Sequence, residues 1–103
     1  MERPKPLGPI EAYEAIQRLL ELRDSISFTW HARKRMRDRQ FTVDDARRVL
    51  VCGTVSPTPE WDEAYQNWKY RVSGLDYDNV RLVLVVALEP DLGRITVITG
   101  EDD

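Results

Sequence analysis

The first half of the chain has the hydrophobic spacing of amphipathic helices. Between residues 10 and 23 the apolar side chains stand three or four positions apart, which predicts one helix over this range. A later helix begins after Thr42, which is a suitable N-cap with Asp45 in the capping-box position, and Gly53 is a natural stop for it. Residues 1–9 hold three prolines and one glycine and are predicted to form a flexible arm.

The second half of the chain has the pattern of β-strands. Residues 67–73 alternate between apolar and polar side chains, which predicts a half-buried strand. Residues 81–88 are nearly all apolar and predict a central strand, and residues 94–99 are rich in β-branched side chains and predict a last one. Residues 54–56 are a short strand candidate, and residues 60–66 are predicted to be a loop.

This order of elements indicates an α+β fold. We expect about three N-terminal helices packed on one face of a three- to four-stranded antiparallel sheet. The chain of 103 residues, 42% of them apolar, is long enough for one domain with a modest core. We place this domain at residues 10–100, between the arm of residues 1–9 and an acidic tail of residues 101–103.

The composition indicates the cellular compartment in which the protein is expected. No apolar run reaches the length of a transmembrane helix, so no membrane partner is predicted, and the polar, proline-rich start does not resemble a secretory signal. Cys52 is the single cysteine, which excludes an internal disulfide and fits a reducing, cytoplasmic location.

The most biased stretch is residues 29–39, which hold the only histidine, His31, and five of the fifteen basic residues. After Thr29, a plausible N-cap, this stretch has no glycine, proline or β-branched residue, so it predicts a helix. Helical spacing places His31, Arg35 and Arg39 on one stripe. The backbone N–H groups of a helix start favour anions such as phosphate.

Charge is segregated along the chain. The net charge of −3 by itself argues against a nucleic-acid binder. However, residues 28–50 carry seven basic and three acidic side chains, whereas the rest of the chain carries eight basic and fifteen acidic ones. A local basic surface can therefore bind phosphates despite the acidic total. We expect the acidic excess to lie in loops and tails.

Four residues form a candidate phosphate-handling set. His31 carries an imidazole, which could transfer a proton, and Arg35 could hold a phosphate through two hydrogen bonds. Lys69 and Arg71, two positions apart on a predicted strand, point the same way. This set suits metal-free RNA cleavage by the ribose 2′-hydroxyl, which requires a proton acceptor, a proton donor and fixed cations.

Further side chains could hold RNA, because aromatic rings stack on bases and arginines bind phosphates. The RNA-binding candidates are Arg33, Arg39, Tyr70 and Arg81, with Trp61 and Trp68 as further stacking rings. One histidine and one cysteine give no metal-ligand cluster, and no glycine-rich phosphate loop or dinucleotide fingerprint is present. Neither a metal nor another cofactor is therefore predicted.

Structural roles stay open for these residues. His31 could simply hydrogen-bond a neighbouring carbonyl. Trp68 and Tyr70 could pack in the core, as their alternation along the strand favours. Lys69 and Arg71 could form a solvated sheet face.

Residues 29–39 also resemble a small prokaryotic family that is catalogued only as a domain of unknown function. The signature His-Ala-x-x-Arg-Met-x-x-Arg is present here as His31-Ala32, Arg35-Met36 and Arg39, and the similarity extends over residues 26–99. That family is considered similar to the RelE-like toxin fold (barnase/EndoU/colicin/RelE type).

The resemblance implies a metal-independent endoribonuclease that cleaves single-stranded RNA, the toxin half of a toxin–antitoxin pair. His31 would be the general acid or base, Arg35 and Arg71 phosphate clamps, and Lys69 a charge stabiliser. Its partners would be RNA, including ribosome-bound mRNA, and an antitoxin protein. Two alternatives are a non-catalytic module that holds RNA or an acidic partner with the basic helix 29–39, and a degenerate member with only a structural role.

Overall fold

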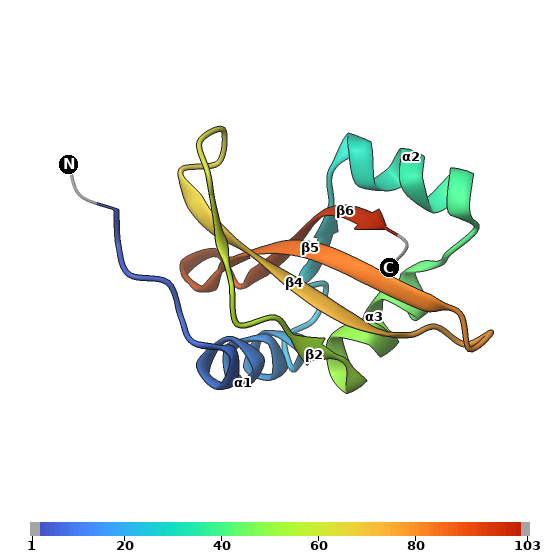
Figure 1. Cartoon of the computed structure of the whole chain (residues 1–103), viewed down its shortest axis with the longest axis horizontal. Coiled ribbons are helices and arrows are strands. Elements are labelled where there is room, and N and C mark those ends of the chain that lie inside the picture. Colours follow the sequence, from blue (N-terminus) through green and yellow to red (C-terminus); the bar gives the residue numbers. More distant parts are fainter. Residues whose placement is uncertain (1–2, 102–103) are drawn as a thin grey trace.

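Three α-helices precede most of the strands in the computed structural model, which describes residues 3–101 (Figure 1). The α+β class predicted from the pattern is confirmed. The elements are α1 (Pro9–Leu20), β1 (Ile26–Phe28), α2 (Trp30–Arg39), α3 (Val43–Cys52), β2 (Thr54–Val55), β3 (Glu60–Asp62), β4 (Asn67–Leu75), β5 (Arg81–Glu89), the 3₁₀ turn η1 (Pro90–Leu92) and β6 (Arg94–Glu101).

The sheet is larger than predicted and is not purely antiparallel. Its six strands have the order β1-β6-β5-β4-β2, and β3 pairs with β4 beside β2. β1 runs parallel to β6, and the other pairs are antiparallel. The predicted count of three to four antiparallel strands is therefore wrong. β1 and β3 have three residues each, too few to show a period, and the partner of β1 lies at the other end of the chain.

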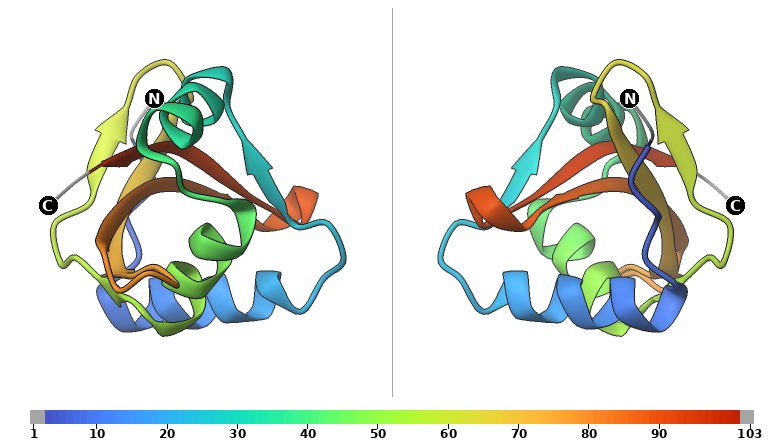
Figure 2. Two further views of the ribbon diagram at one scale, coloured as in Figure 1. Left: turned by 90° about the vertical axis from the view of Figure 1, so that its right-hand side faces the viewer. Right: turned by 90° about the vertical axis from the view of Figure 1, so that its left-hand side faces the viewer.

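α1 and α3 cover one face of the sheet, and their apolar side chains form the core with every second residue of β4, β5 and β6 (Figure 2). Removing one such side chain from water contributes about 1.5–3 kcal/mol. The fully buried members include Ile16, Val49, Leu50, Val72, Leu84, Val86, Ile95 and Val97. α2 lies apart from α1 and α3, contrary to the expectation that all helices share one face, although its Ala32 belongs to the core and its Met36 packs against it.

α2 instead lies beside the edge of β6. β1 stops at Phe28, opposite Val97, and the next three bonds to β6 come from Thr29 and α2. The N–H of Thr29 donates to Val97 O at 3.1 Å and its hydroxyl donates to Ile98 O at 2.8 Å. Arg35 Nε donates to Gly100 O at 3.1 Å. The helix thereby satisfies edge carbonyls that would otherwise be open to solvent or to another strand.

The capping predictions for α2 and α3 are confirmed. Thr29 Oγ1 accepts the N–H of Ala32 at 3.0 Å. In α3, Thr42 Oγ1 accepts the N–H of Asp45 at 3.1 Å, and Asp45 Oδ2 accepts the N–H of Thr42 at 2.9 Å. Such caps satisfy the first N–H groups of a helix, which have no partner within it.

The residues before α1 lie along the β3–β4 hairpin. Trp68 Nε1 donates to Pro4 O at 2.6 Å, and the N–H of Leu7 donates to the Tyr70 hydroxyl at 2.9 Å. Residues 1–2 and 102–103, the ends of the predicted arm and tail, lie outside the described residues. In the part of the chain that is described, no helix combines the length and the apolar character needed to span a bilayer.

Candidate functional site

The sheet face turned away from α1 and α3 carries polar side chains from β4. Successive strand residues point to opposite faces, and Tyr70 and Val72 are buried in the core. Lys69 and Arg71 therefore point to the open face, as the alternation predicts. Antiparallel pairing places Ala87 beside Lys69 and Val85 beside Arg71 on that face.

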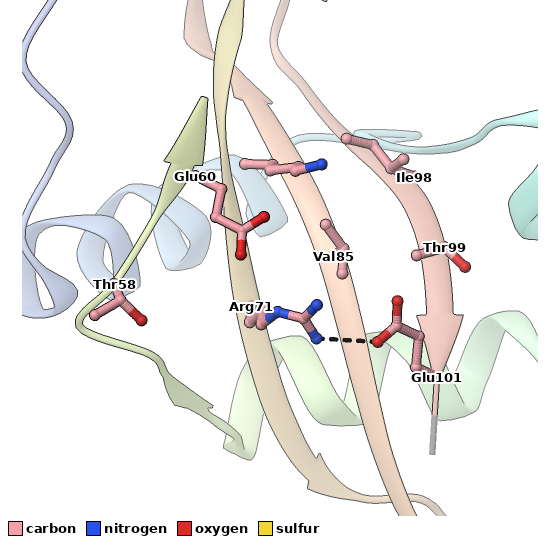
Figure 3. A pocket seen from close by; sticks show the side chains of 8 residues that line it. Thr58, Glu60, Arg71, Val85, Ile98, Thr99 and Glu101 are labelled. Carbon is pink, nitrogen blue, oxygen red and sulfur yellow. Dashed lines mark hydrogen bonds and ion pairs between the residues drawn. The ribbon is translucent and has the colours of Figure 1, made fainter. Parts of the chain in front are cut away.

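A pocket of about 80 Å³ opens on this face. We call it the sheet pocket; its lining residues are Thr58, Glu60, Lys69, Arg71, Val85, Ile98, Thr99 and Glu101. Figure 3 shows Arg71 extending over Val85 toward Glu101, with Glu60 on the other side and the helices behind the sheet. Two basic and two acidic residues thus face one another over an apolar floor.

Both cations of the sheet pocket pair with carboxylates. Arg71 lies 3.0 Å from Glu101, and Lys69 lies 3.6 Å from Asp62. The Arg71–Glu101 pair is more than one third exposed on both sides, and exposed pairs contribute only about 0–1 kcal/mol. A bound phosphate could therefore replace Glu101 as the partner of Arg71 at little cost.

A β-bulge shapes the far wall of the sheet pocket. Val85 pairs with Thr99 and Val86 pairs with Val97, so Ile98 is an extra residue in β6. Bulges bend a strand and redirect its side chains, and they are frequent beside functional sites. Here the bulge brings two successive residues, Ile98 and Thr99, into the pocket wall.

The α2 candidates do not line the sheet pocket. His31 is exposed in the first turn of α2, and Arg35 is partly buried against Gly100 O. Neither is a lining residue of the pocket. Thr29, two residues before His31, donates to the carbonyl of Ile98, which does line it. The structure therefore brings Lys69 and Arg71 together in the pocket, whereas His31 and Arg35 lie on α2 and are not among its lining residues.

The RNA-binding candidates are dispersed. Arg33 is exposed on α2, Arg39 is partly exposed at its end, and Arg81 is exposed at the start of β5. Tyr70 is only 5% exposed, and its hydroxyl accepts a bond from Leu7. Burial raises the pKa of this phenol. Because Tyr70 is a core residue on the helix-covered face, its ring offers no surface on which a base could stack.

The two tryptophan candidates also belong to the packing of the hairpin. Trp61 and Trp68 are directly opposite each other in β3 and β4, and their rings meet edge to face at 5.4 Å. The Arg3 guanidinium lies 5.1 Å from the centre of the Trp61 ring. Such contacts are typical of structural aromatic pairs.

Sequence reasoning missed the two carboxylates of the sheet pocket. Glu60 was expected in a loop and Glu101 in the tail, but they lie in β3 and β6. The expectation that the acidic excess lies in loops and tails is wrong for these residues. Glu60 is opposite Lys69 in the strand register, and a hairpin centred on residues 63–66, with Trp61 facing Trp68, is the signal that could have indicated it.

Carboxylates elsewhere are held by specific bonds. The Arg94 guanidinium donates to Glu89, and this bond, together with the one from the Thr96 hydroxyl, lowers the pKa of Glu89 despite its partial burial.

Among residues 3–101 no three His, Cys, Asp or Glu side chains gather in a way that could hold a metal ion.

With this α+β architecture and its polar sheet pocket, the chain can be compared with known families. Residues 28–99 match the model of the family described as "Domain of unknown function (DUF4258)". The match covers more than half of the chain, which therefore belongs to this family. No curated protein gave a significant match, and neither did any solved structure.

Proposed function

We propose that this protein is a metal-independent endoribonuclease of the RelE-like toxin type, which cleaves single-stranded RNA through attack of the ribose 2′-hydroxyl. The observation that carries the proposal is the sheet pocket, where Lys69 and Arg71 face Glu60 and Glu101 on the open side of the sheet. The cations can stabilise the charge that develops during a 2′-hydroxyl attack, and a carboxylate can accept the proton of the hydroxyl.

In this mechanism the scissile phosphate lies against Arg71. Arg71 and Lys69 offset the negative charge that develops on phosphorus in the transition state. Glu101 would be displaced from Arg71 by the phosphate. Its carboxylate would then accept the proton of the 2′-hydroxyl, because it lies 3.0 Å from the guanidinium that holds that phosphate. Glu60 is the second carboxylate that could take this role.

The 2′-oxygen then forms a bond to phosphorus while the bond from phosphorus to the 5′-oxygen breaks. The leaving 5′-oxygen must gain a proton, and His31 would donate it, because an imidazole can act as a general acid. The products are a 2′,3′-cyclic phosphate and a 5′-hydroxyl. Arg35 would act as a positioning residue for β6 through its bond to Gly100 O.

A second candidate function is a non-catalytic module that binds RNA or an acidic protein through α2. Arg33, Lys34 and Arg37 are exposed on this helix, and Trp30 is 75% exposed. An exposed aromatic ring among cations can hold an anionic strand without chemistry. This reading predicts RNA binding that depends on α2 and is not followed by cleavage.

The experiment is an RNA cleavage assay in EDTA. The native protein, Arg71→Gln, Glu101→Gln and His31→Ala are each incubated with single-stranded RNA and with DNA of the same sequence. The proposal predicts that the native protein cleaves RNA but not DNA, leaves a 2′,3′-cyclic phosphate, and loses at least tenfold in rate in each variant. Arg18→Gln on the exposed side of α1 is the matched control and should retain full activity.

Other results would contradict the proposal. Binding without cleavage would favour the α2 module, and cleavage that stops in EDTA would point to a metal-dependent reaction. The toxin role is tested separately: expression in a bacterial cytoplasm should arrest growth when the protein is native and not when it carries Arg71→Gln. Co-expression of a genomic neighbour that relieves the arrest would identify an antitoxin.

A further inference from the structure

A second, larger pocket lies near the opposite end of β4. It has a volume of about 470 Å³. We call it the arginine pocket; it is lined by Arg48, Cys52, Gly53, Thr54, Ser73, Gly74, Leu75 and Arg81. Two of its lining residues are arginines. Unlike the sheet pocket, it has no carboxylate among its described lining residues. Its charge therefore favours an anionic ligand.

The two arginines come from different elements and are oriented by their neighbours. The Arg48 guanidinium, on α3, lies 4.9 Å from the centre of the exposed Tyr77 ring. Arg81 Nη2, at the start of β5, lies 3.5 Å from Ser73 Oγ. Arginines held in this way lose less freedom when they bind a phosphate, whose oxygens match the guanidinium fork. The Thr54 and Ser73 hydroxyls add neutral donors.

β4 connects the arginine pocket to the sheet pocket. Arg71 lines the sheet pocket and Ser73 lines the arginine pocket, and side chains two apart on a strand share a face about 7 Å apart. The pairing of Leu75 with Arg81 puts Arg81 on that same face. A row of basic side chains, Lys69, Arg71 and Arg81, thus lies along the open face.

We propose that the arginine pocket is a second phosphate subsite, which binds a backbone phosphate of the same RNA strand whose scissile phosphate lies in the sheet pocket. The inference rests on the proposed function and adds to it that the substrate is an extended strand. The distance along β4 from Lys69 to Leu75 is about 20 Å, so the strand must be several nucleotides long to reach both pockets.

The first test measures binding and does not depend on cleavage. A twelve-nucleotide single strand with 2′-O-methyl groups at every position, which cannot undergo 2′-hydroxyl attack, is titrated by fluorescence anisotropy over a series of salt concentrations. Each lost phosphate contact lowers the slope of log K against log salt by about 0.7 for a single strand. Arg48→Gln and Arg81→Gln should each lower the slope by about this amount.

Two controls keep this result specific. Arg48→Lys and Arg81→Lys retain the charge and should keep most of the slope, and Arg18→Gln on α1 removes a charge outside the row. Thermal unfolding of each variant shows whether it is folded at the assay temperature. Slopes that stay at the native value in both glutamine variants, or that fall equally in Arg18→Gln, would overturn the subsite.

The second test uses cleavable RNA of two lengths. With a twelve-nucleotide RNA, the Arg48→Gln and Arg81→Gln variants should lose at least fivefold in kcat/KM, mainly through a higher KM. With a dinucleotide, which cannot reach the arginine pocket, the same variants should match the native protein. If the native protein cleaves neither RNA, the proposed function fails while the salt slopes still decide the subsite. If the native protein cleaves both RNAs and the effect of the substitutions does not depend on RNA length, the second subsite is contradicted while the proposed function stands.

Discussion

The Arg71 guanidinium lies 3.0 Å from the Glu101 carboxylate across the open face of the sheet. Arg71 comes from β4 and Glu101 from the end of β6, so the pair bridges two strands that are separated by β5. A cation that would hold phosphate and a carboxylate that would accept a proton are thereby placed together before any substrate binds. This relationship allows the two roles to be separated by mutation.

Glu101→Gln should separate binding from chemistry. The amide leaves Arg71 without an anionic partner, so affinity for a non-cleavable RNA should be unchanged or higher. The amide cannot accept the 2′-hydroxyl proton, so the single-turnover cleavage rate should fall by about 10²–10⁴-fold. Anisotropy and rapid-quench cleavage measure the two effects. A variant that cleaves at the native rate would remove Glu101 from the mechanism and leave Glu60 as the candidate.

His31 and Arg35 should differ in their effects on stability. His31 is exposed, and its replacement by alanine should change the free energy of unfolding by less than about 0.5 kcal/mol. Arg35→Ala removes the donor to Gly100 O and should cost about 1 kcal/mol. Urea unfolding followed by circular dichroism compares the two. Equal losses would mean that His31 makes a structural contact, which weakens its role as proton donor.

Asp45 should give the protein a pH-dependent stability. Burial acts to raise its pKa, but bonds from the Tyr77 N–H, the Thr42 N–H and the Thr42 hydroxyl outweigh it, so the pKa is lowered from 3.8. The unfolded chain then binds a proton more readily than the folded one. The stabilisation is therefore present above about pH 4 and is lost as the pH falls through the lowered folded pKa.

Asp45→Asn checks this dependence. The amide has one acceptor oxygen where the carboxylate uses two, for Tyr77 and for Thr42, and it carries no charge. The variant should therefore lose about 1–2 kcal/mol at neutral pH. Its stability should also fall less steeply than that of the native protein below pH 4. Urea midpoints measured from pH 2.5 to 7 provide the comparison. If the stability of the two proteins falls equally steeply below pH 4, another carboxyl group, such as that of Glu89, causes most of the loss of stability in acid.

The elements that could be predicted from the sequence are those whose signal is local. The cap at Thr29, the capping box at Thr42 and the alternation along β4 depend on neighbours within a few residues, and the structure has them. β1 could not be predicted, because three residues carry no period and its partner is β6. The same reason applies to the site. Lys69 and Arg71 share one strand, whereas Glu60 and Glu101 are brought to them only by the register of three strand pairings, β3–β4, β4–β5 and β5–β6.

The packing of Gly100 against Phe41 is also a long-range feature and leads to a test. A Cβ at Gly100 would lie 2.5 Å from Cζ and 2.7 Å from Cε1 of Phe41, a buried ring between α2 and α3. Gly100→Ala should therefore cost about 1–3 kcal/mol through overpacking. It should also lower any RNA cleavage, because Gly100 precedes Glu101 and accepts the bond from Arg35.

Phe41→Leu provides the matched rescue. A leucine has no atoms at the ring positions that the new Cβ would meet, so the double variant should be more stable than the sum of the two single losses predicts. The coupling from a double-mutant cycle in urea should be about 0.5–3 kcal/mol. Gly53→Ala is the contrast, since its Cβ would meet the backbone carbonyls of Val49 and Ser73, which no side-chain change can relieve. Strict additivity at Gly100 and Phe41 would show that the loss comes from the backbone of β6 and not from the ring.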